Sequence, residues 1–180
     1  LKKQKYIIDF RRDLHMRPEL SGEEVRTSRR IAEELGARGI PFVREGKGNI
    51  VGKITGTRTC DIYQNHSDNA AGACGISVSG IGNKTIAIRG DFDALPVKEE
   101  TGLSFASLND GVMPACRHDA HAAGVLDAVK MLKEHEVDFA GTVYVCFQMG
   151  EEIVEGAEEI IEYLESEGIV DRMVAYMSSG

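Results

Sequence analysis

Helical and extended spacings of hydrophobic residues alternate along this chain of 180 residues. Apolar residues at every third or fourth position predict amphipathic helices, which cover residues 2–16, 24–36, 120–134 and 154–166. Short runs rich in β-branched and aromatic residues predict strands, which cover residues 42–43, 49–54, 84–89, 142–147 and 173–177. Strands that alternate with helices predict a layered α/β/α domain with a largely parallel central sheet, in which strands 84–89 and 142–147 are adjacent or nearly so.

Local signals predict where the first two helices begin and end. Pro18 ends the first helix, so His15 is interpreted as a surface residue at the helix end. Ser21 stands three residues before Glu24, which is the spacing of a capping box at the start of the second helix. Val25 would then face inward, as would Ala157 and Ile161 in the last helix.

Residues 55–83 do not fit this alternation. They are rich in Gly, Ser, Thr, Asn and Ala and show little periodicity, so they are predicted to be a loop or an insertion. The chain begins with Leu1 and stops at Gly180 just after an apolar run, and we therefore expect it to be a fragment.

Composition narrows the classes of protein that the chain could belong to. It is 42% hydrophobic and carries a net charge of −8 with no long basic run, which argues against nucleic-acid binding. No apolar stretch approaches the roughly 18 residues that a membrane span requires. The four cysteines are too few and too scattered for a disulfide scaffold, so the sequence predicts a cytoplasmic protein.

Three polar clusters stand where an α/β sheet forms its binding sites, at the carboxyl ends of strands or at the start of a helix. They cover residues 89–96, 116–121 and 148–152. We expect Asp93, Cys116 and Glu152 to lie along the same rim of the sheet. Each cluster alone is a weak signal, and together they form a coherent set.

Cys116 and His118 are candidate metal ligands because a thiolate and an imidazole both bind borderline-soft divalent cations. Two residues apart in an extended segment, their side chains would share a face. The helix that follows would favour the thiolate through its dipole. The alternative is a buried cysteine beside a surface histidine.

Glu151 and Glu152 follow a strand, so their carboxylates are predicted to point to opposite sides. One could bind a cation while the other moves the proton of a water molecule, which is the division of labour that amide hydrolysis requires. Asp91 and Asp93 share a face, and an aspartate beside a ligating histidine would orient its ring. The alternatives are a solvated glutamate pair and an ordinary turn.

Taken in order, four stretches of the chain resemble the N-acyl-amino-acid amidohydrolases, the family of the hippurate hydrolases and the plant auxin-conjugate hydrolases. The stretches cover residues 11–21, 89–103, 113–121 and 147–152. The resemblance spreads over most of this chain and under half of a full family member. It makes residues 1–180 the N-terminal portion of the catalytic domain, which is incomplete at its C-terminus.

The resemblance also implies a site and the groups that bind there. Two divalent metal ions would be held, with Cys116, His118 and Glu152 as ligands, Glu151 as general base and acid, and Asp93 as the orienting residue. Zinc, manganese, nickel and cobalt all suit such mixed ligands. A lid or dimerisation domain beyond the chain would offer a surface for a homodimer, and a further ligating histidine would follow it.

This chain departs from the family pattern at several positions. Pro114 and Arg117 stand in place of a histidine and a glycine around Cys116, and Met149-Gly150 replaces Pro-Ala. A further ligating histidine of the family would fall near Tyr176 or Met177. At most three of about five protein ligands are therefore present.

These observations predict hydrolysis of the amide bond of a small N-acyl amino acid, or of a short peptide, with no nucleic acid or membrane involved. A metallo-carboxypeptidase or dipeptidase would use the same site with a different pocket. A degenerate, metal-free relative would fold and bind without catalysis. Residues 1–180 alone are expected to be inactive, because ligands and pocket walls are missing from them.

Overall fold

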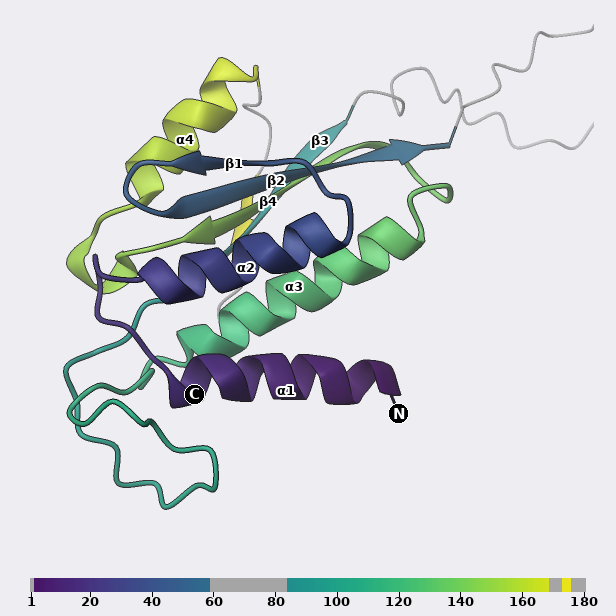
Figure 1. Ribbon diagram of the computed structural model, residues 1–180. Helices are drawn as coiled ribbons and strands as arrows, with labels where there is room; N and C mark the ends of the chain where they lie inside the picture. Colours follow the sequence, from purple (N-terminus) through teal and green to yellow (C-terminus); the bar gives the residue numbers. More distant parts are fainter. Residues whose placement is uncertain (1, 59–83, 169–172, 176–180) are drawn as a thin grey trace, which may run out of the picture.

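The computed structural model describes residues 2–58, 84–168 and 173–175, which form one five-stranded sheet with helices on both of its faces (Figure 1). The elements in chain order are α1 (Lys2–Met16), α2 (Val25–Ala37), β1 (Phe42–Glu45), β2 (Asn49–Thr57), β3 (Thr85–Asp91), α3 (His118–Glu134), β4 (Ala140–Gln148), the 3₁₀ turn η1 (Glu151–Ile153), α4 (Ala157–Ser166) and β5 (Met173–Ala175).

The strand order is β1-β2-β4-β3-β5. Strand β3 is parallel to both β4 and β5, whereas β2 is antiparallel to both β1 and β4. Four of these five strands thus run in one direction, as expected of a largely parallel sheet. The predicted adjacency of strands 84–89 and 142–147 is confirmed, with Asp91 opposite Gln148 at their carboxyl ends.

Helices α1, α2 and α3 cover one face of the sheet and α4 covers the other (Figure 1). On the three-helix side, Phe10, Ile31 and Val125 pack with Ile50 and Phe147 from the strands. On the other side Ile160 and Leu164 of α4 pack against the sheet. The α/β/α layering is therefore confirmed, and it follows from strands whose successive side chains enter opposite cores.

The predicted capping box at the start of α2 is wrong. The Ser21 hydroxyl donates to Asp93, and the N-cap residue Glu24 makes no side-chain hydrogen bond to the helix start. Instead, the carboxylate of Glu19 accepts the backbone N–H groups of residues 26 and 27, at 2.9 and 2.7 Å. A negative group at this end also complements the helix dipole. The helix start is therefore capped by Glu19, which lies outside the predicted box of residues 21–24.

Several predicted boundaries and orientations also shift. Val25 is 77% exposed and Ile161 46% exposed, and Ala157 is exposed as well, so none of the three faces inward. Helix α3 begins at residue 118 rather than 120, and α4 begins at 157 rather than 154. Residues 55–57 extend β2, while residues 59–83 and 176–177 of the predicted loop and last strand lie outside the described residues. Among the helices that the structure describes, none has the length and apolar character to cross a bilayer.

Candidate metal centre

The chemistry-bearing residues meet where the ends of β3 and β4 adjoin the first turn of α3. Asp91 ends β3 and Asp93 follows it, His118 begins α3, and η1 after β4 carries Glu151 and Glu152. The parallel pairing of β3 with β4 places their carboxyl ends side by side. Residues from three distant parts of the chain therefore line one rim of the sheet.

His118 is the centre of this group. Its Nδ1 lies 2.6 Å from the carboxylate oxygen Asp93 Oδ1 and donates to it, so that Nε2 faces the other side. Around Nε2, Asp91 Oδ1 and Glu152 Oε1 lie at 3.7 Å and Glu151 Oε2 lies at 3.8 Å. Three carboxylates thus converge on one imidazole nitrogen.

Two sets of side chains in the described part of the chain have the geometry to hold a cation. Cys116, His118 and Glu152 place their ligand atoms within 4.8 Å of one another, and Asp91, His118 and His121 do the same. Sequence reasoning singled out the first set but gave His121 no definite role. The signal that could have found it is the three-residue spacing of His118 and His121, which places both on one face of a helix.

Two details of this arrangement differ from the sequence-based expectation. Cys116 and His118 are brought together by a turn rather than an extended segment, because Arg117 adopts a left-handed backbone with φ 67° and ψ 26°. Glu151 and Glu152 lie in a 3₁₀ turn, and both approach His118 Nε2 instead of pointing to opposite sides. The turn at Arg117 and the turn η1 therefore bring the candidate ligand atoms close together.

The carboxylates shape the electrostatics of the site. Burial acts to lower the pKa of His118, but the hydrogen bond to Asp93 and the charges of Asp91 and Glu151 outweigh it and raise the pKa. The hydrogen bond with Glu152, with burial second, raises the pKa of Cys116 to about 11. The surroundings of Cys116 therefore favour the thiol over the expected thiolate. Among the carboxylates, Asp91 is paired with the guanidinium of Arg89 at 2.7 Å.

Asp93 connects the two halves of the site. Its Oδ1 holds His118, while its Oδ2 accepts the Ser21 hydroxyl at 2.7 Å and the backbone N–H of Glu152 at 2.9 Å. Burial acts to raise the pKa of Asp93, and these three hydrogen bonds outweigh it and lower the pKa. One ionised carboxylate thus fixes the ring of His118 and the position of Glu152 together.

His15 was interpreted as a surface residue, and this is wrong, since it is 4% exposed. Its Nδ1 lies 2.9 Å from Asp119 Oδ2 and its Nε2 lies 3.2 Å from Glu99 Oε1. The hydrogen bond with Asp119 is the largest cause that raises the pKa of His15, against the effect of burial. His15 therefore links α1 to the residue after His118 and to the loop before α3.

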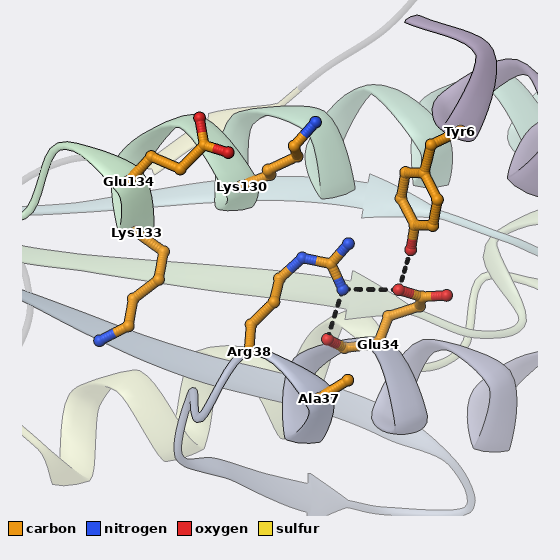
Figure 2. Close-up of a pocket in the computed structure, with 7 residues that line it drawn as sticks. All are labelled: Tyr6, Glu34, Ala37, Arg38, Lys130, Lys133 and Glu134. Atoms are coloured by element: carbon orange, nitrogen blue, oxygen red, sulfur yellow. Dashed lines mark hydrogen bonds and ion pairs between the residues drawn. The ribbon is translucent and has the colours of Figure 1, made fainter. Parts of the chain in front are cut away.

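A separate hollow of about 400 Å³ lies between α1, α2 and α3 (Figure 2). Its polar groups bind one another, since Glu34 accepts hydrogen bonds from Tyr6 and Arg38. Lys130 on its wall lies twelve residues along α3 from His118, or about 18 Å at the helical rise. This hollow is therefore not part of the candidate metal centre.

A family model described as Peptidase family M20/M25/M40 matches residues 87–179. Among curated proteins, the chain is 35% identical over 158 residues to an N-acetylcysteine deacetylase of Bacillus subtilis, covering 87% of the chain and 36% of the relative. It is 37% identical over 162 residues to thermostable carboxypeptidase 1 of Saccharolobus solfataricus, covering 87% of the chain and 35% of the relative. The chain thus spans about a third of the length of these relatives.

Among solved structures, the fold matches a dinuclear metal-binding peptidase of the M20 family from Bacillus subtilis. The TM-score is 0.81 at 31% identity, covering 99% of this chain and 44% of that one. A second match is a protein described as a putative aminohydrolase from methicillin-resistant Staphylococcus aureus, with a TM-score of 0.78 at 37% identity and coverage of 98% and 41%.

Proposed function

This chain belongs to peptidase family M20/M25/M40, and on that basis we propose that the protein carrying it hydrolyses the amide bond of N-acyl amino acids with the help of two divalent cations. The single observation that carries the proposal is the convergence of three carboxylate oxygens on His118 Nε2 at 3.7–3.8 Å. The names of relatives support the substrate class, since they include an N-acetylcysteine deacetylase and an N-acyl-L-amino acid amidohydrolase of Geobacillus stearothermophilus.

The residues present fit a divalent cation. Two atoms that each lie ~2.1 Å from one tetrahedral ion are about 3.4 Å apart, close to the separations around His118 Nε2. A thiol, an imidazole and carboxylates form the mixed donor set that suits zinc, manganese, nickel or cobalt. A cation would also compensate the carboxylates, and it would favour the thiolate of Cys116, whose pKa is otherwise raised to about 11.

We assign Cys116, His118 and Glu152 as ligands, and Asp93 as the residue that orients His118. Bound there, the cations would supply Lewis acidity, which acidifies water and polarises the amide carbonyl. Glu151, whose side chain is 39% exposed, would take a proton from the attacking water and return it to the leaving amine. Its partial exposure gives water and substrate access that the buried Asp93 lacks.

A second candidate function is hydrolysis of a peptide bond by a metallo-carboxypeptidase or dipeptidase. The 37% identity to a thermostable carboxypeptidase favours it, because the same rim would serve either amide. A degenerate relative without metal is the third alternative. Arg117 favours that alternative, since it stands where a glycine is expected between two ligands.

The test uses the intact protein that carries residues 1–180, purified and loaded with zinc, manganese or cobalt. Cys116→Ser should lower bound metal and activity together, whereas Glu151→Gln should keep metal and nearly abolish turnover. Glu158→Gln, on the exposed face of α4, is the matched control and should change neither. Metal loss in Glu151→Gln with retention in Glu152→Gln would mean that the two roles are reversed.

The choice of substrate separates the remaining alternatives. N-acetyl and N-benzoyl amino acids are compared with dipeptides and with C-terminally free peptides at equal concentration. A higher kcat/KM for the peptides would favour the carboxypeptidase or dipeptidase function. An intact protein that binds no divalent cation and hydrolyses neither class would be the metal-free relative.

A further inference from the structure

The turn that carries Glu151 and Glu152 has an irregular backbone, with several residues in the left-handed conformation. Between β4 and α4, Gly150, Val154 and Gly156 all have positive φ, at 65°, 59° and 81°. Within the turn, two backbone hydrogen bonds reach the carbonyl of Gly150 and one reaches that of Glu151. Strained left-handed conformations so close together persist only when contacts from the surrounding structure hold them in place.

Three buried polar side chains from other elements hold this turn by accepting its backbone N–H groups. The pairs are Asn49 Oδ1 with Met149, Glu24 Oε1 with Gly150 and Asp93 Oδ2 with Glu152, at 2.9, 2.7 and 2.9 Å. All three acceptors are at most 1% exposed. The position of the turn is therefore set from α2, β2 and the end of β3 together.

Among the three acceptors, Glu24 is the one farthest along the sequence from the residue that it binds. It stands directly before α2 and 126 residues from Gly150, and the peptide that it binds leads directly into Glu151. Asn49 also donates to the carbonyl of Gly156, and Asp93 also holds His118. Burial raises the pKa of Glu24. Its Oε1 accepts the Gly150 N–H at 2.7 Å, so the reach of the side chain fixes how far that peptide lies from the start of α2.

We propose that Glu24 is a positioning residue of the metal centre, whose side-chain length sets the place of the Gly150 peptide and so the approach of Glu151 and Glu152 to His118. The inference rests on the proposed function. Shortening the side chain by one methylene would let the turn move by about 1 Å, and displacements of that size cost up to about 10²-fold in rate. Mutation of a residue that supports a metal ligand typically lowers metal affinity or activity by about 10–100-fold.

The experiment compares Glu24→Asp, which keeps the charge and loses the length, with Glu24→Gln, which keeps the length and an accepting oxygen. Glu34→Asp is the matched control, because Glu34 is also a buried glutamate but binds Tyr6, Arg30 and Arg38 away from the turn. In the intact protein, Co²⁺ affinity, the visible absorption spectrum of bound Co²⁺, kcat and KM are measured for each variant.

We expect Glu24→Asp to change the Co²⁺ spectrum and to lower kcat by about tenfold or more while KM stays within about twofold. Glu24→Gln should keep the wild-type spectrum and a kcat within about threefold, and Glu34→Asp should keep the spectrum. A wild-type spectrum and kcat in Glu24→Asp would overturn the proposal. A Glu24→Gln variant as impaired as Glu24→Asp would also overturn it, because a side chain of full length with an accepting oxygen would then not be enough to hold the turn.

Two further outcomes are separated by the same measurements. A wild-type protein that binds no Co²⁺ overturns the proposed function and this inference with it, whereas wild-type binding with an unchanged Glu24→Asp overturns only the role of Glu24. If Glu24→Asp does not fold, amide hydrogen exchange at Gly150 in Glu24→Gln decides instead. Protection equal to wild type supports the proposal, and lost protection overturns it.

Discussion

Arg117 holds a left-handed backbone conformation between Cys116 and His118, and replacing it with glycine is expected to stabilise the fold. Its φ is 67°, and it precedes α3 without making a side-chain cap bond. The side chain is exposed, so Arg117→Gly removes no buried contact. The only other non-glycine residue with positive φ in the described part of the chain is Val154, at 59°.

The size of the gain follows from two opposing terms. A left-handed conformation costs an ordinary L-residue about 1–2 kcal/mol. The extra conformational entropy of glycine in the unfolded chain offsets about 0.4–1 kcal/mol of that stabilisation. Arg117→Gly should therefore raise the free energy of unfolding by about 0.5–1 kcal/mol, which in a chain of this size moves the melting temperature by about 1–4 °C.

Arg117→Ala is the control, because it removes the same charge but keeps the β-carbon that makes the conformation costly. Urea unfolding of the metal-free protein, followed by circular dichroism, should show a higher midpoint for the glycine variant alone, with an unchanged slope. If the alanine variant gains as much, the charge of Arg117 and not its backbone is the cause. If the glycine variant gains nothing, the strain argument fails.

Three other outcomes are expected. Asp93→Ala should weaken Co²⁺ binding by about 10–100-fold, because it frees the ring of His118, and a metal titration that matches wild type would contradict this. The hydrogen bond with Asp119 raises the pKa of His15, so protonated His15 should stabilise the fold fully below pH ~6.5, the unfolded-state pKa. This stabilisation should be lost as pH rises through the folded-state pKa. The urea midpoints of wild type and His15→Gln should therefore converge as the pH is raised. Gly156→Ala places a methyl carbon 2.2 Å from a backbone oxygen at φ +81°, so its unfolding midpoint should fall by more than that of Gly36→Ala, whose methyl carbon meets nothing.

The sequence by itself predicted the architecture because the signals for it are local. The helical stripe from Tyr6 to Leu14 and the apolar run that ends at Phe147 each report which face is buried, and their alternation indicates the layers. The same patterns pointed to Cys116, His118 and Glu152, since residue type and position, before a helix for the first two and after a strand for Glu152, are visible in the chain.

The tertiary structure alone decided how that cluster is held. Glu24 binds Gly150 across 126 residues, and His15 binds Asp119 across 104. No spacing rule connects such pairs, so local reasoning assigned Glu24 to a helix cap and His15 to the surface. A buried polar group must find a partner wherever the fold places one, and that placement depends on how the layers pack rather than on which residues are neighbours in the sequence.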